Sequence, residues 1–186
     1  DRGGPQLTEL LERALRIQGR FWIRMLYIHP DNFPDNLLEL CRNDARLLPY
    51  FDIPFQHASD RLLQRMNRNG NMQRYLTLVK NIRKKIPSAV IRSTFLVGFP
   101  GENRADFRML QAFQQEAQFD WLGTFAYSRE EDTSAYRCQG PLRYRLGRRV
   151  REKRKELIEN RQQQIMEERM DRFVGSCMDV LIEEKV

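Results

Sequence analysis

Segments with strand character alternate with helical segments along the first two-thirds of this 186-residue chain, and this alternation constrains its fold more than any other feature. Strands and helices of these lengths predict parallel βαβ units joined by right-handed crossovers. The predicted fold class is therefore α/β, either an open sheet or part of a barrel wall, since four strands are too few to close a barrel. The predicted strands cover 21–27, 50–55, 90–97 and 121–127, and the predicted helices cover 7–17, 35–46, a short segment from Ser59, a longer one through 75–86, and 104–117.

The remainder of the chain predicts two further parts. A polar, turn-rich stretch over 129–140 precedes one long helix over 142–173, and residues 176–184 alternate like the opening strand of another domain. We therefore expect a sheet unit over 1–140, a connecting helix over 141–174, and the start of a further domain over 175–186.

The long helix concentrates the positive charge of the chain. It carries 11 Lys and Arg residues against 6 Asp and Glu, in a chain whose net charge is +7. Cations such as Arg148, Arg149 and Arg151 could dock on RNA phosphates. They could equally belong to a solvated linker helix whose Lys and Arg stems cover the edge of the sheet, and for most of the cations the linker is the better explanation.

Composition excludes several classes of protein. No stretch approaches the roughly 18 apolar residues of a transmembrane helix, so no membrane is expected. The three cysteines, Cys41, Cys138 and Cys177, are odd in number and widely spaced. This pattern favours a reducing cytoplasm over a disulfide framework, and it makes a metal site built by this chain alone unexpected. The chain opens on Asp1 without a start methionine, and we expect a segment upstream of it.

Two of the predicted strands carry polar side chains on one face. By the period of two, Asp52 and Gln56 lie opposite the apolar positions of the second strand, and Arg92 and Thr94 share one face of the third. The polar faces would line the inner side of the sheet, which suggests a cavity for a polar ligand. An ion pair between Asp52 and Arg92 on neighbouring strands is an equally good explanation.

The segment that follows the third strand is rich in glycine. Gly98 and Gly101 flank Phe99 and Pro100, and Glu102 stands immediately before a helix capped by Asn103. Ligands of parallel α/β folds bind outside the carboxyl ends of strands, where Glu102 could bond a hydroxyl or an amine. Alone, such a segment is more often a tight βα turn. His57 lies on the same rim, and we expect it to be a hydrogen-bonding or structural histidine and not a general base.

Three runs together carry a family resemblance. They are YFDIPFQHASD at 50–60, IRSTFLVGFPGE at 91–102 and FDWLGTFAYS at 119–128. In this order and spacing they closely resemble the radical S-adenosylmethionine methylthiotransferases, specifically the branch that modifies an aspartate of ribosomal protein S-twelve and not the branch that modifies tRNA. The resemblance spans essentially the whole chain.

The resemblance implies a fold, a cofactor and a set of binding residues. The fold would be the latter strands of a partial (β/α) radical-SAM barrel, followed by the basic helix and the first strand of a TRAM-like β-barrel. Gln56 and Glu102 would bond the amino-acid or ribose end of S-adenosylmethionine, and Arg92 its carboxylate. The positions that match the cofactor site of the family are Gln56, His57, Arg92, Thr94, Gly98, Phe99, Gly101 and Glu102.

The main departure from the family is the lack of the cysteine motif C-x-x-x-C-x-x-C. In the family these cysteines bind a [4Fe-4S] cluster that reductively cleaves S-adenosylmethionine, and an N-terminal domain holds a second cluster. The resemblance therefore implies that this chain is the core of a longer enzyme and is inactive by itself. Asp132 stands where the family more often has glycine.

The implied partners are ribosomal protein S-twelve or the small ribosomal subunit, with RNA contact through the basic helix and the TRAM domain. Two alternatives stay open at this point. The substrate could be tRNA, or the chain could be a cluster-free module that binds the ribosome or RNA.

Overall fold

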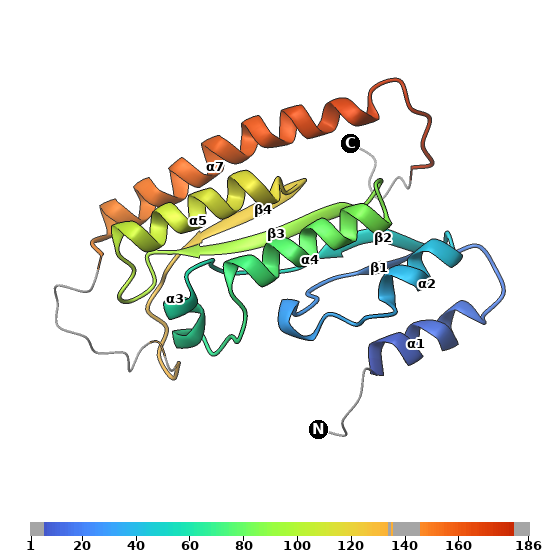
Figure 1. The fold of residues 1–186 in the computed structure, drawn as a ribbon, viewed down its shortest axis with the longest axis horizontal. Helices are drawn as coiled ribbons and strands as arrows, with labels where there is room; N and C mark the ends of the chain where they lie inside the picture. Colours follow the sequence, from blue (N-terminus) through green and yellow to red (C-terminus); the bar gives the residue numbers. More distant parts are fainter. Residues whose placement is uncertain (1–5, 134, 136–145, 181–186) are drawn as a thin grey trace.

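The four predicted strands form a single parallel sheet whose spatial order follows the chain, β1-β2-β3-β4 (Figure 1). A computed structural model of the protein describes residues 6–133, 135 and 146–180. The elements are α1 (Gln6–Leu15), β1 (Ile23–Met25), the 3₁₀ helix η1 (Pro30–Asn32), α2 (Leu37–Asn43), β2 (Leu47–Asp52), α3 (Asp60–Arg65), α4 (Met72–Lys85), β3 (Val90–Val97), α5 (Arg104–Ala117), β4 (Trp121–Ala126), α7 (Arg148–Met170) and the 3₁₀ helix η3 (Asp171–Phe173).

The strand predictions hold at the centre of the sheet and fail at its β1 edge. β3 has the predicted bounds, and β4 ends one residue early. The prediction for β1 was too long, because this edge strand has one neighbour and Tyr27 turns to a φ of 59°. The strand predicted over 50–55 begins earlier, at Leu47, and ends at Asp52. The chain nevertheless continues beside β3 as far as Gln56, whose N–H donates to the Thr94 carbonyl at 2.8 Å.

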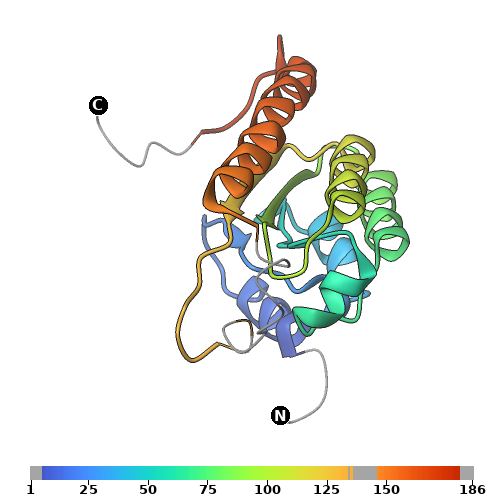
Figure 2. The same ribbon diagram turned by 90° about the vertical axis from the view of Figure 1, so that its left-hand side faces the viewer.

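The predicted alternation of faces is confirmed. Phe55 of the segment after β2 and Phe95 of β3 are fully buried on the outer face of the sheet. There they meet Phe113 of α5, whose ring centroid lies 5.4 Å from that of Phe55 and 5.8 Å from that of Phe95. Figure 2 looks along the strands and shows α4 and α5 on this side. The apolar core therefore lies outside the sheet, and the polar inner face is left open.

The predicted N-terminal cap is confirmed for α5 and is wrong for α3. Asn103 caps α5 in a full capping box, in which Asp106 accepts the return hydrogen bond from the Asn103 N–H. Ser59 precedes α3 as predicted but makes no capping hydrogen bond. Its hydroxyl instead donates to Asp106 Oδ1 at 2.6 Å, so it joins two helices that are distant in sequence.

Helix α7 packs along the sheet, over β4 and beside α5 (Figure 1). It starts at Arg148, whereas the prediction began at 142; residues 142–145 lie outside the described part of the chain. Ile158 and Ile165 are buried, and Gln162 Nε2 donates to the Phe119 carbonyl at 2.8 Å. Because α7 also buries Arg154, the linker prediction was incomplete, although Arg148, Arg149 and Lys153 of α7 are exposed.

The last described residues, 176–180, have no regular secondary structure, and the rest of the strand predicted over 176–184 lies outside the described residues. A single strand gains nothing without a neighbour to pair with. In the part of the chain that the structure describes, no helix combines the length and the apolar character needed to cross a membrane.

Candidate functional site

The inner face of the sheet carries a charged pair at its centre. Arg92 of β3 donates from Nη1 to Asp52 Oδ2 of β2 at 2.8 Å, as one of the two sequence-based explanations predicted. Asp52 is buried, but its Oδ1 atom has no hydrogen-bond partner among the described residues. A buried carboxylate oxygen without a partner carries a desolvation cost. The Arg92 side chain is 36% exposed and keeps its charge accessible on the inner face, so both explanations of these residues can be true together.

Unengaged polar groups surround this pair. The half-buried side chains of Gln56 and Thr94 make no hydrogen bond to any described residue, and Gln56 adopts a φ of 67°, in the left-handed region. Next to β3, Trp121 and Phe125 of β4 are aligned with Arg92 and Leu96 and are 47% and 60% exposed. Open aromatic faces beside free amide and hydroxyl groups suit a ligand with a cation, hydroxyls and a flat ring.

The glycine-rich segment lies at the carboxyl end of β3. Gly98 and Gly101 have φ values of 77° and 89°, which side chains rarely adopt. At Gly98 an added Cβ would also collide with the side chain of Arg151, and Arg151 Nη1 donates to the Tyr127 carbonyl. Phe99 packs edge-on against the Tyr127 ring, with centroids 5.5 Å apart. Helix α7 therefore holds the loop between β3 and α5 from outside.

Glu102 is a buried anchor of this loop. One carboxylate oxygen accepts from the Gly98 N–H, and the other accepts from Nη1 of Arg154, itself only 7% exposed. Burial raises the pKa of Glu102, while Arg154 and the loop amides oppose that shift. The prediction that Glu102 bonds a ligand directly stays a prediction. In the structure its oxygens hold the loop closed on itself.

His57 lies behind the loop, away from solvent. Its Nδ1 accepts from the Ser59 N–H at 3.0 Å, and its Nε2, which has no hydrogen-bond partner among the described residues, is 3.9 Å from Glu102 Oε2. Burial lowers the pKa of His57 to about 4, although Asp106 partly opposes the shift. The neutral ring suits the structural role that the sequence favoured.

The buried histidine predicts a loss of stability in mild acid. Because the pKa of His57 falls from 6.5 to about 4 on folding, the unfolded chain binds the extra proton between those values. The free energy of unfolding should decrease by up to about 3 kcal/mol as the pH falls through this window. His57→Asn keeps an acceptor for Ser59 and should show a shallower decrease in urea unfolding measured at each pH. The exposed His29→Asn is the control; equal slopes for all three proteins would contradict the prediction.

The structure groups the eight predicted site residues into two sets. Arg92 and Thr94 share the open inner face and Gln56 follows β2 beside β3, aligned with Phe95, whereas the segment 98–102 and His57 form the rim. Asp132 adopts a φ of 62°, in the left-handed region that favours glycine. This backbone conformation explains why the family more often has glycine at this position.

Sequence reasoning missed two of the residues that build this region. The period of two had placed Asp52 on the polar face, but nothing in the sequence indicated its unpaired oxygen. The pairing of Arg154 with Glu102 had no local signal, because 52 residues separate the two side chains.

A parallel βα sheet with helices on its outside and an open polar face at its inner side is the architecture of a ligand-binding barrel wall. The sequence model of the radical SAM superfamily matches residues 3–113, and the chain belongs to that superfamily. A solved structure with a similar fold is coproporphyrinogen III oxidase, HemN, from Escherichia coli, a radical SAM enzyme. It has a TM-score of 0.60 at 16% identity, over 91% of this chain and 36% of HemN.

Relatives with high similarity over nearly the whole chain are described as ribosomal protein uS12 methylthiotransferase RimO, where uS12 is S-twelve. The enzyme from Aquifex aeolicus is 43% identical over 178 residues, which is 96% of this chain and 40% of the relative. The enzyme from Treponema denticola is 43% identical over 97% of this chain and 39% of its own length, and that from Clostridioides difficile is 41% identical over 99% and 40%. The chain thus spans about 40% of the curated relatives it matches.

Proposed function

We propose that this chain is the cofactor-binding core of an enzyme that methylthiolates the β-carbon of an aspartate in ribosomal protein S-twelve, using S-adenosylmethionine and iron-sulfur clusters in a radical mechanism. The observation that carries the proposal is the identity of about 40% to RimO enzymes over almost the whole chain. Ribosomes assemble in the cytoplasm, and we place the activity there.

S-adenosylmethionine fits the inner face of the sheet. Its carboxylate would meet the half-exposed Arg92, and its hydroxyls would meet the free groups of Gln56 and Thr94. Phe125 offers an exposed ring to the adenine or to the sulfonium. When bound, the cofactor would supply the methyl group and the radical chemistry of the superfamily.

The rim residues take a different role in this proposal. The backbone of Gly98, Phe99 and Gly101 would border the cofactor, and its course is set by the positive φ values of the two glycines and by the bond from the Gly98 N–H to Glu102. His57 and Glu102 act through the loop by fixing its shape from behind. They are therefore positioning residues in this proposal, and they do not make the direct contact with the cofactor that the sequence led us to expect.

The described residues do not fit an iron-sulfur cluster. They contain no group of three or more His, Cys, Asp or Glu side chains placed to hold a metal ion. Cys41 is buried in the core, where burial raises its pKa to about 11. Cys177 is exposed, and Cys138 lies outside the described residues. In the proposed enzyme, residues outside the described part of this chain therefore supply the cluster ligands.

Further proposals concern the C-terminal part. Residues 175–186 begin a TRAM-like domain, and the connecting helix leads into it from the sheet unit. This proposal is supported by the alternation of apolar residues at Met178, Val180 and Ile182 in the sequence that follows η3.

The cofactor site can be tested on the chain itself by NMR. On titration with S-adenosylmethionine, backbone amide shifts should concentrate on the inner face of β2, β3 and β4 and on the loop at 98–102. Thr94→Val removes one free hydroxyl and should weaken binding several-fold, in line with the roughly 1 kcal/mol of a hydrogen bond. Thr124→Val is the matched control, because Thr124 lies on the neighbouring strand but faces the outer side, where its hydroxyl has no described partner.

Two results would count against the proposed site. Shifts confined to the outer helices would place the ligand elsewhere. Equal weakening by Thr94→Val and Thr124→Val would show that the inner face makes no specific contact.

A further inference from the structure

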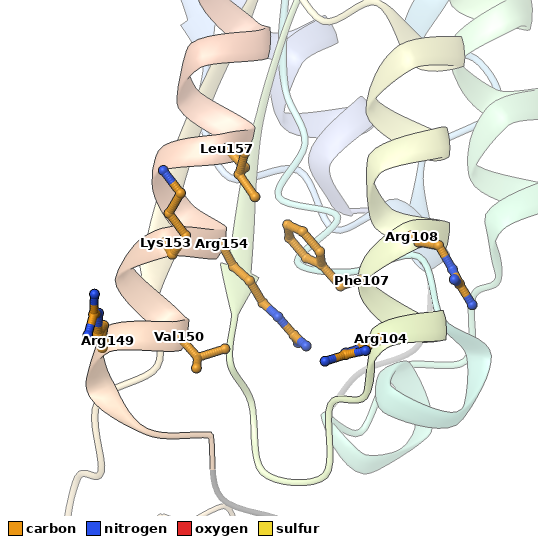
Figure 3. Close-up of a pocket in the computed structure, with 8 residues that line it drawn as sticks. All are labelled: Arg104, Phe107, Arg108, Arg149, Val150, Lys153, Arg154 and Leu157. Atoms are coloured by element: carbon orange, nitrogen blue, oxygen red, sulfur yellow. The ribbon is translucent and has the colours of Figure 1, made fainter.

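A basic groove lies between α5 and α7, on the outer side of the sheet and away from the proposed cofactor face. Its volume is about 480 Å³. Arg104 and Arg108 of α5 line one side, and Arg149, Lys153 and Arg154 of α7 line the other (Figure 3). No acidic residue is among the described residues that line it. Two helices thus gather five cations around one groove, and the cations of α5 are more than 40 residues from those of α7 in sequence.

Most of this positive charge is uncompensated. Arg154 pairs with Glu102, and Lys153 makes an exposed contact with Glu156 at 2.9 Å. Arg104, Arg108 and Arg149 are exposed and make no ion pair with any residue that the structure describes. Like charges gathered without partners repel one another and raise the local affinity for anions.

The floor of the groove is apolar. Val150 and Leu157 of α7 are 44% and 41% exposed, and the ring of Phe107 lies beneath Arg154, whose Cζ is 4.9 Å from the ring centroid. Figure 3 shows Arg104 and Arg154 converging at one end of this floor, with Lys153 and Arg149 on the α7 rim. A ligand that fits must combine repeated negative charge with flat or apolar surface.

We propose that this groove binds single-stranded RNA, with phosphates on its arginines and a base or ribose on its floor. The three exposed cations without an ion pair, Arg104, Arg108 and Arg149, are all arginine, whose planar guanidinium matches phosphate in a bidentate manner. RNA also presents its bases beside the charged backbone, as the apolar floor requires. The choice of RNA rests on the proposed function, because a ribosomal protein substrate is surrounded by RNA. An acidic peptide is the competing ligand.

The test measures fluorescence anisotropy of a labelled mixed-sequence RNA of about 20 nucleotides with the 186-residue chain. We expect binding that weakens with salt. The variant Arg104→Glu/Arg108→Glu should lower the affinity at least about tenfold. It should also reduce the slope of log affinity against log salt concentration by about 1.4, because two phosphate contacts are lost and each contributes about 0.7 to that slope. Arg16→Glu/Arg42→Glu makes the same charge change at exposed positions just after α1 and in α2, toward the β1 edge of the sheet and away from the β4 edge on which α7 packs.

Equal weakening by the two variants would reduce the binding to general charge attraction and overturn the proposal. Tighter binding of a poly-glutamate peptide of the same charge would overturn it in favour of an acidic protein. The assay contains no S-adenosylmethionine, so its outcome is independent of the cofactor site. The groove variant should also keep the NMR response to S-adenosylmethionine, which separates failure of this inference from failure of the proposed function.

Discussion

Arg154→Met should lower the free energy of unfolding by about 3–5 kcal/mol, the cost of leaving a buried charge without its partner. Arg154 is 7% exposed, and it neutralises a Glu102 carboxylate that is 3% exposed. Methionine fills similar space beside Phe107 but cannot donate a hydrogen bond. Urea unfolding followed by tryptophan fluorescence measures the change.

Two further proteins make this result specific. Lys153→Met is the matched control on the same helix, where the side chain is 61% exposed, and it should cost less than about 0.5 kcal/mol. The double variant Glu102→Gln/Arg154→Met should recover part of the loss, because a neutral amide needs no counter-ion. If Arg154→Met and Lys153→Met unfold at the same urea concentration, helix α7 does not anchor the loop in the way the contacts indicate.

Asp120→Asn should be the second most damaging change, at about 3 kcal/mol. Asp120 is fully buried before β4 and holds three arginines. Its Oδ1 accepts from Arg169 at 2.7 Å and from Arg172 at 2.8 Å, and Arg83 lies 3.9 Å from Oδ2. The three arginines keep partial access to water, which limits the cost of losing the negative charge.

The loss should be local to the C-terminal end of α7. Hydrogen exchange should therefore quicken in the last turns of α7 and in η3 before it does so in β3. Asp171→Asn, at an exposed position in η3, is the control and should change the free energy of unfolding by less than about 0.5 kcal/mol. Equal stability of Asp120→Asn and Asp171→Asn would contradict the anchoring role of Asp120.

The sequence predicted the parts of the fold that depend on local pattern. Strand β3 was placed correctly because Val90–Val97 combines β-branched residues with strict alternation of buried and open positions. The same alternation correctly separated Asp52 and Arg92 from the core positions Phe51 and Ile91. The family motifs indicated the superfamily because they lie at the ends of strands, where a parallel sheet binds its ligand.

The features that the sequence missed are contacts between distant segments. The ties from α7 to the loop, through Arg151 and Arg154, have no periodic signature in a helix where cations occur all round. Arg151 was grouped with Arg148 and Arg149 as a surface cation, but it contacts the Tyr127 carbonyl and packs against Gly98. Only the folded arrangement separates the cations that build the site from those that face solvent.

We propose that the gene encoding this chain is responsible for methylthiolation of ribosomal protein S-twelve. The most direct test of this proposal is mass spectrometry of S-twelve and of tRNA nucleosides from cells with and without the gene. The account predicts that deletion removes one methylthio group from an aspartate of S-twelve and leaves methylthiolated tRNA nucleosides unchanged. Unmodified tRNA together with fully methylthiolated S-twelve after deletion would contradict the account and identify a tRNA-modifying enzyme.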